Sequence, residues 1–173
     1  MLQKSLEYPA PDAVRTRNNI FRSPIGRIQY YSPNDTDVLQ EYFVPPESFV
    51  DFVDRLRDIV QRRRVNLLNA TVRYIEPNDD AFLNYAGRPA LAVVLYMNVK
   101  TSVSGQADSS ETAREIIELA LNDEGTFYLP YVLDFTKSEL LRGYPMAGEF
   151  FAAKKRYDPS EMFSSEFYSR YSR

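Results

Sequence analysis

The chain of 173 residues contains neither cysteine nor histidine. Their absence excludes disulfide bonds, zinc sites of the Cys/His type, and catalysis by a cysteine nucleophile or a histidine acid or base. Any chemistry in this chain must therefore use tyrosine, lysine, arginine, aspartate or glutamate, or be supplied by a cofactor or a partner. A lack of cysteine also fits a reducing compartment, and we expect a cytoplasmic protein.

Long apolar runs and an excess of positive charge are missing as well. No apolar run approaches 18 residues, so the sequence predicts no transmembrane helix. The first residues, "MLQKSLEYPAPDAVRTRNN", lack the apolar core of a secretory signal. The net charge of −3 argues against a nucleic-acid partner. The six glycines are scattered and form no phosphate-binding G-x-G-x-x-G loop.

What the chain does contain is enough apolar material for a core. Hydrophobic residues make up 44% of the chain, which is too many for a disordered protein. Residues 1–38 are punctuated by "YPAP", "RSP" and "YSPNDTD", and we expect an irregular lead-in there.

Apolar periodicity predicts six elements between residues 39 and 131. In chain order they are a strand at 39–44, a helix at 46–64, strands at 65–75 and 91–99, a helix opening at Asp108, and a strand at 125–131. This βαββαβ order predicts a ferredoxin-like α+β domain over residues 39–135, with an antiparallel sheet and both helices on one face. Residues 136–173 are expected to form a helical extension, with capping pairs at Thr136/Glu139 and Asp158/Glu161.

Two groups of side chains are candidates for a binding site. In the strand at 65–75, alternation places Asn69, Thr71 and Arg73 on the face away from the helices, where they could contact a ligand or simply face water. In "GTFYLPY" (125–131), Tyr128 and Tyr131 could donate hydrogen bonds or stack, or could be ordinary core residues. Strict alternation would put these two rings on opposite faces unless Pro130 interrupts the strand.

Two charged segments have simpler interpretations. Glu76, Asp79 and Asp80 are acidic enough to suggest a metal, but "PNDD" is typical of turns, and we expect no metal site. The run Lys154–Arg156 could grip a phosphate, or it could close a helix, whose negative dipole end attracts cations.

Five phrases stand in order along the chain: "LQEYFVP" (39–45), "NATVRYI" (69–75), "GTFYLPY" (125–131), "YP" (144–145) and "KKRYDPSEMFSSEFY" (154–168). In order and spacing they resemble the C-terminal half of FAD-linked oxidases of the vanillyl-alcohol-oxidase type, the relatives of alditol oxidase, gulonolactone oxidase and decaprenylphosphoryl-ribose oxidase. The resemblance implies a substrate, or cap, domain whose sheet lies over the flavin ring. In the complete enzyme, hydride would pass from a small C–OH substrate to FAD.

The resemblance also implies site residues and a partner. Glu41 stands where sugar-oxidising relatives often place a polar pocket residue, and Tyr128 resembles a tyrosine on the corresponding strand. Tyr131 stands where several relatives carry a lysine, a departure from the sugar-alcohol oxidases. With Asn69 and Arg73 these residues form the expected substrate- and flavin-facing set; no catalytic residue is assigned.

The family's N-terminal FAD-binding domain does not occur in these 173 residues. We expect it as a partner, and we expect the chain alone to hold no flavin and to be inactive. Phe163, Phe167 and Tyr171, four residues apart, would form a stripe that docks on that domain and is partly exposed without it. The alternative is a stand-alone ferredoxin-like module that binds a small ligand or RNA.

Overall fold

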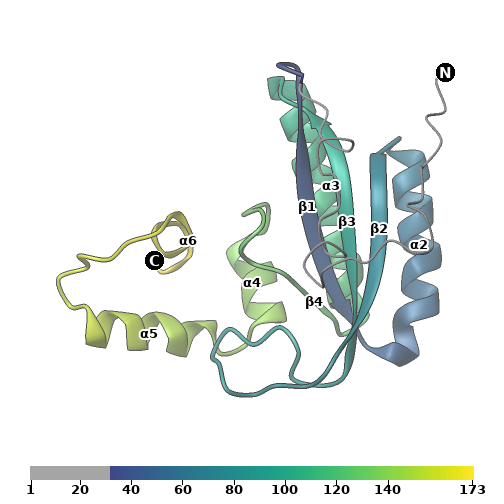
Figure 1. The fold of residues 1–173 in the computed structure, drawn as a ribbon. Helices are drawn as coiled ribbons and strands as arrows, with labels where there is room; N and C mark the ends of the chain where they lie inside the picture. Colours follow the sequence, from purple (N-terminus) through teal and green to yellow (C-terminus); the bar gives the residue numbers. More distant parts are fainter. Residues whose placement is uncertain (1–31) are drawn as a thin grey trace, which may run out of the picture. The chain divides into compact units, whose positions relative to one another are not determined.

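The computed structural model describes residues 32–173 and has an α+β fold built on a four-stranded antiparallel sheet (Figure 1). The strands are β1 (Asp35–Val44), β2 (Asn66–Ile75), β3 (Ala90–Lys100) and β4 (Thr126–Phe127). Their order across the sheet is β2-β3-β1-β4, and every neighbouring pair is antiparallel. β1 and β3 are therefore interior strands, and β2 and β4 are the two edges.

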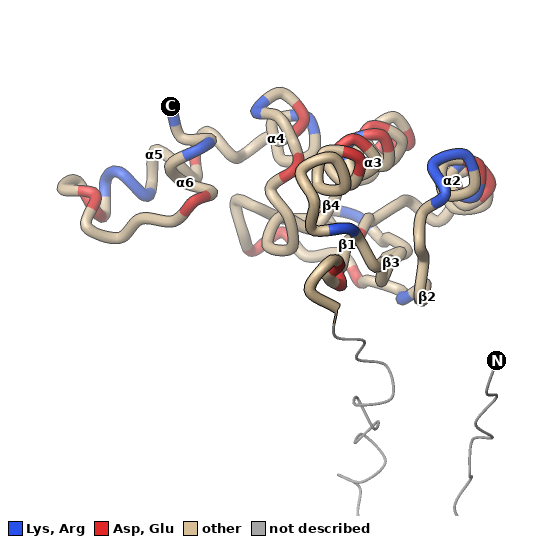
Figure 2. The backbone as a smooth tube through the Cα atoms, turned by 90° about the horizontal axis from the view of Figure 1, so that it is seen from above, with Lys and Arg blue, Asp and Glu red and all other residues tan. Residues whose placement is uncertain are grey.

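Five α-helices follow or separate these strands in the described part of the chain. They are α2 (Phe49–Arg62), α3 (Val103–Asn122), α4 (Lys137–Gly143), α5 (Ala147–Tyr157) and α6 (Glu166–Tyr171), and a short 3-10 helix, η2 (Pro46–Ser48), precedes α2. Seen from above, α2 and α3 lie on the same side of the sheet (Figure 2). The predicted order of strand, helix, strand, strand, helix, strand is confirmed for residues 35–127.

The first and last strands of the predicted domain differ from expectation in length. β1 begins at Asp35, four residues earlier than predicted, because it pairs with β3 over ten consecutive positions. β4 has two residues, although the sequence predicts a strand over 125–131. Tyr128 N still donates to Glu41 O at 2.8 Å, but Pro130 has no N–H to continue the ladder. The irregular lead-in predicted for residues 1–38 is wrong for Asp35 to Val38, which belong to β1, and residues 1–31 lie outside the described residues.

One of the three helix starts predicted from capping residues is confirmed, and the other two lie elsewhere. The Thr136–Glu139 capping box opens α4 as predicted. α3 begins five residues before Asp108, because Ser102 Oγ accepts from Gly105 N at 3.2 Å and caps the helix there. The helix predicted at Asp158 is wrong: Asp158 ends α5, and α6 starts after Ser165. The Asp158 carboxylate instead accepts from Met162 N and Phe163 N, both at 3.0 Å, in a turn where Glu161 has φ 53°.

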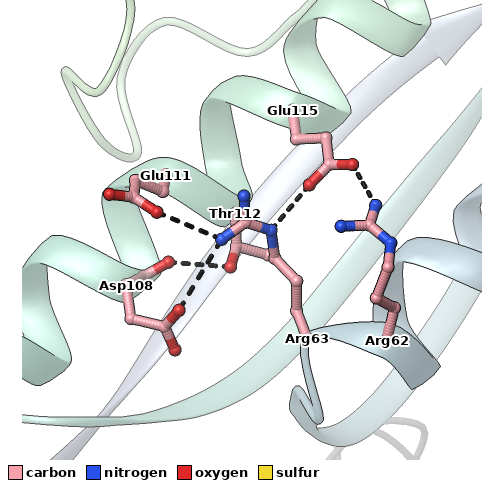
Figure 3. A network of polar contacts seen from close by, with 6 residues as sticks. All are labelled: Arg62, Arg63, Asp108, Glu111, Thr112 and Glu115. Atoms are coloured by element: carbon pink, nitrogen blue, oxygen red, sulfur yellow. Dashed lines mark hydrogen bonds and ion pairs between the residues drawn. The ribbon is translucent and has the colours of Figure 1, made fainter.

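The core lies between the sheet and the helices. Apolar spacing on α2 buries Phe52, Leu56 and Ile59 against β3 and α3. A charged network joins the same two helices at their solvent side (Figure 3). Glu115 of α3 accepts from Arg62 and, at 2.6 Å, from Arg63 Nε, while Arg63 also reaches Glu111 at 3.3 Å.

The C-terminal stripe is divided between the core and solvent. Tyr171 is 2% exposed, stacks on Phe135 with ring centroids 4.7 Å apart, and donates to Phe135 O at 2.7 Å. Phe167 packs against the same core, whereas Phe163 is 79% exposed. The expectation of an exposed stripe therefore holds for Phe163 and is wrong for Tyr171, because the chain supplies its own aromatic partner.

None of the helices in residues 32–173 is both long and apolar enough to cross a membrane.

Candidate functional site

The strand register separates the sheet into a helix-covered face and an open face. Side chains directly opposite in antiparallel strands share a face. Arg73 pairs with Ala92, which on its other side pairs with Phe43. In the same way Thr71 pairs with Val94 and Val94 with Glu41, while Asn69 pairs with Tyr96 and Tyr96 with Leu39. The neighbouring row of β3, with Val93 and Leu95, belongs to the helix-side core. The predicted placement of Asn69, Thr71 and Arg73 on the face away from the helices is confirmed.

The alternate row of β2 is less covered than expected. Val72 and Tyr74 pair with Val93 and Leu91 on the helix side, yet they are 52% and 56% exposed. β2 is an edge strand, so no neighbouring strand covers the outer side of these side chains. The row that alternation predicts to be buried is therefore half open to solvent.

A buried carboxylate and an exposed guanidinium meet on the open face. Glu41 on β1 is 5% exposed and accepts a hydrogen bond from Arg73 Nη2 on β2, a side chain that is 56% exposed. The pair spans β3 diagonally, above the small side chain of Ala92. A buried charge without a partner is costly, so the Glu41 carboxylate favours this position of Arg73, whose half-exposed side chain has further N–H donors.

Four aromatic rings gather next to this ion pair, and we refer to them as the aromatic cluster: Phe43, Tyr85, Tyr128 and Tyr131. Tyr85 stacks on Phe43 at 4.4 Å, Tyr128 meets Tyr85 edge-on at 6.0 Å, and Tyr131 meets Tyr128 edge-on at 4.8 Å. Tyr128 and Tyr131 thus converge, contrary to strict alternation, because β4 ends at Phe127 and the segment through Pro130 is no longer a strand. Glu41 lines a small crevice together with these two tyrosines.

The three tyrosine hydroxyls of the cluster are available to a ligand. The hydroxyls of Tyr85, Tyr128 and Tyr131 make no hydrogen bond to another described residue, and no buried side-chain polar atom in that part of the chain lacks a partner. These hydroxyls therefore face water. By contrast, burial raises the pKa of Tyr144, whose hydroxyl is bonded to Phe127 O.

A groove of about 830 Å³ adjoins the aromatic cluster. One wall is the 128–134 segment with Tyr128, Tyr131 and Leu133, and the other is α6, with Phe167 and Arg170. A volume between about 300 and 1,000 Å³ is usual for small-molecule sites. Sequence reasoning missed Tyr85 and Arg170, because neither belongs to a periodic pattern that points to the groove.

The far end of the open face is polar. Tyr96 donates to Asp37 Oδ2 at 2.5 Å, and Asn98 Nδ2 donates to Asp37 Oδ1 at 2.8 Å. The hydrogen bond to Asp37 raises the pKa of Tyr96. Asn69 lies at this end, opposite Tyr96 and four residues from Arg73, roughly 13 Å along the strand. Of the five predicted site residues, the fold gathers Glu41, Arg73, Tyr128 and Tyr131, and it leaves Asn69 apart.

The other charged segments have structural roles. Asp80 N donates to Asn78 Oδ1 at 2.8 Å, as in an Asx turn, and no group of three or more possible metal ligands gathers within residues 32–173. Lys154 pairs with Asp158 at 2.8 Å and lies over the Tyr168 ring at 4.1 Å. The three cations occupy the last turn of α5, where the helix dipole favours them.

Comparison with known proteins gives no matching family model and no matching curated protein. The open face can orient a polar ligand with Arg73 and stack a flat one on the partly exposed rings of Tyr85 and Tyr131.

Proposed function

We propose that this chain is the ferredoxin-like substrate domain of an FAD-dependent oxidoreductase of the vanillyl-alcohol-oxidase type. The observation that carries the proposal is the Glu41–Arg73 pair beside the aromatic cluster on the open face of the sheet. The βαββαβ order, with α2 and α3 on one side, supports the ferredoxin-like assignment. It also leaves the opposite face available to a second domain.

The residues of the open face fit a flavin ring and not the rest of the dinucleotide. The rings of Tyr85 and Tyr131, each 39% exposed, offer an apolar surface, and Arg73 offers donors to an electron-rich ring edge. The chain has no glycine-rich loop to hold a pyrophosphate. FAD, held by the partner domain, would supply the hydride acceptor for the reaction.

The chain's own residues would bind and orient the substrate. Glu41 fixes the Arg73 guanidinium through a bond made from a buried position, so Arg73 presents its remaining donors in one direction. Tyr128 and Tyr131 present hydroxyls that suit a substrate hydroxyl, and the adjoining groove accommodates the body of a small molecule. We assign these residues to positioning and none to proton transfer.

The test begins with the native form of the protein. An antibody against this chain is used to isolate the polypeptide or complex that contains it, and flavin is released by denaturation and quantified. We expect FAD in a one-to-one ratio with this chain. A native form that is active or intact without any flavin would contradict the proposal.

Arg73→Ala then tests the site in the flavin-containing form. Loss of a charged hydrogen bond to substrate predicts a fall in kcat/KM of about 10-fold to 100-fold. Arg57→Ala on α2 is the matched control, since Arg57 is 60% exposed and, among the described residues, pairs only with Asp54 in the same helix. Equal kcat/KM for the two variants would remove Arg73 from the site.

The groove also favours a second candidate, a stand-alone module that binds a small ligand. RNA is a poorer ligand for the open face, because Asp35, Asp37 and Glu41 lie on it and accept bonds from the cations and amides nearby. A native chain that carries no flavin and is stabilised by a small molecule, with loss of that effect in Tyr131→Ala, would favour this candidate.

A further inference from the structure

The outer edge of β2 is a long strand edge without a partner in the described part of the chain. β2 has ten residues, contains no proline, and carries a single charge, Arg73. From Leu68 to Tyr74 its backbone bonds only to β3 among the described residues. Proteins usually block such an edge with charges, prolines or a covering element, because its free N–H and C=O groups pair readily with another strand.

The side chains along this edge are also more apolar than an exposed strand requires. Val72 and Tyr74 in the helix-side row are 52% and 56% exposed, and Leu68 at the bulge is 45% exposed. The opposite edge of the sheet differs, because β4 is only two residues long. A second strand can therefore add to this sheet on the β2 side.

We propose that β2 pairs antiparallel with β2 of a second copy of this chain, about a two-fold axis at Thr71, and so forms a continuous eight-stranded sheet. In this register Thr71 meets its own counterpart, Ala70 meets Val72, and Asn69 meets Arg73. The helix-side row then pairs apolar with apolar, and the open-face row pairs polar with polar. A C2 interface requires this kind of self-complementary patch.

Neighbouring symmetric registers fit less well. An axis at Arg73 would set two guanidinium groups against each other, which is destabilising. An axis at Val72 would set Asn69 against Ile75, a partly buried apolar residue. An axis at Ala70 would set Asn66 against Tyr74 and carry the pairing past the bulge between Leu67 and Asn69.

The dimer also changes the site on the open face. Asn69 lies four residues from Arg73 within one chain, but the partner subunit's Asn69 would lie directly opposite Arg73, with Cβ atoms about 5 Å apart. The amide could then bond the ligand that Arg73 holds. Dimerisation itself does not depend on flavin, so its test is independent of the proposed function.

Cross-linking tests the register in the full-length chain. Thr71→Cys introduces the only cysteine in the molecule, and across the axis the two thiols would be close. Under mild oxidation we expect a covalent dimer of twice the 20.1 kDa chain mass. Val103→Cys, at an apolar position that is 87% exposed on α3, is the matched control and should cross-link at least about 10-fold more slowly. Equal rates for the two variants would overturn the proposal.

Sedimentation tests whether the dimer exists without a cross-link. We expect the unmodified chain to show a concentration-dependent dimer, and Thr71→Lys, which sets two cations at the axis, to be monomeric with an unchanged far-UV spectrum. Val72→Lys is a second disrupting variant in case Thr71→Lys does not fold, and Val103→Lys is the control. A monomer at every concentration of the unmodified chain, or a dimer that both lysine variants leave intact, would overturn the proposal.

Discussion

The division of the C-terminal stripe gives the sharpest test of the fold, because two aromatic residues eight positions apart have opposite environments. Tyr171 is 2% exposed and Phe163 is 79% exposed. We predict that Tyr171→Ala strongly destabilises the chain, and that Phe163→Ala leaves its stability unchanged within about 0.5 kcal/mol.

The magnitude follows from what Tyr171 contacts. Truncation of a buried aromatic ring costs about 3–5 kcal/mol, and this ring packs on both Phe135 and Phe167. The hydroxyl adds a hydrogen bond to Phe135 O worth about 1 kcal/mol. Movement of the short helix α6 into the vacated space recovers part of the lost packing energy. We therefore expect the free energy of unfolding to fall by about 4 kcal/mol. That is a large fraction of the usual 5–15 kcal/mol of a domain.

Urea unfolding followed by far-UV circular dichroism measures the difference. With a denaturant slope of about 2 kcal/mol per molar, the midpoint of Tyr171→Ala should fall by about 2 M relative to Phe163→Ala. Tyr171→Phe, which keeps the ring and removes only the hydroxyl, should fall by about 0.5 M. Coincident midpoints for the two alanine variants would refute the conclusion that the chain's own core holds this terminus.

Two further predictions concern the backbone and the charged network. Gly125→Ala should lower the free energy of unfolding in urea by about 1–3 kcal/mol, because the added Cβ would lie 2.4 Å from Phe43 O. Gly148→Ala, whose added Cβ would meet nothing within 4 Å, should be neutral or stabilising by up to about 1 kcal/mol. Unchanged stability of Gly125→Ala would contradict this packing. Desolvation raises the pKa of Glu115, but the hydrogen bonds from Arg62 and Arg63 outweigh it and lower the pKa below 4.5. The contribution of these bonds to folding stability is therefore present above pH 4.5 and is lost as pH falls through the folded pKa. Glu115→Gln should therefore cost about 1 kcal/mol at neutral pH and nothing well below pH 4.5, and an equal cost at both pH values would contradict the ion-pair account.

The parts of the structure that sequence reasoning predicted depend on local periodicity. Helical spacing predicted the buried side of α2, and two-residue alternation predicted the open-face position of Asn69, Thr71 and Arg73. Both patterns follow from backbone geometry within one element, so no knowledge of neighbouring elements is needed.

The parts that sequence reasoning did not predict depend on contacts between elements. Tyr85 joins Phe43 because the 76–89 loop folds back over the end of the sheet, where Thr126 Oγ1 bonds Tyr85 O at 2.6 Å. The path of a long loop leaves no periodic signal. Asp158 fits two local motifs, because its carboxylate can accept the N–H bonds of either a helix N-terminus or a turn. Lys154 and the N–H groups of the turn decided the outcome.

The diagonal ion pair on the open face also bears on the motions of the sheet. In the monomer β2 is an edge strand, and edge strands are usually the first to fray, since they are held along one side only. If the C-terminal half of β2 separated from β3, Arg73 would leave and Glu41 would keep its buried charge without a counter-ion. That opened state has a high free energy, so the Glu41 carboxylate on the interior strand β1 opposes the separation of the edge strand β2. Amide hydrogens near Arg73 should consequently exchange more slowly than those near Asn69, and Glu41→Gln should reduce that contrast.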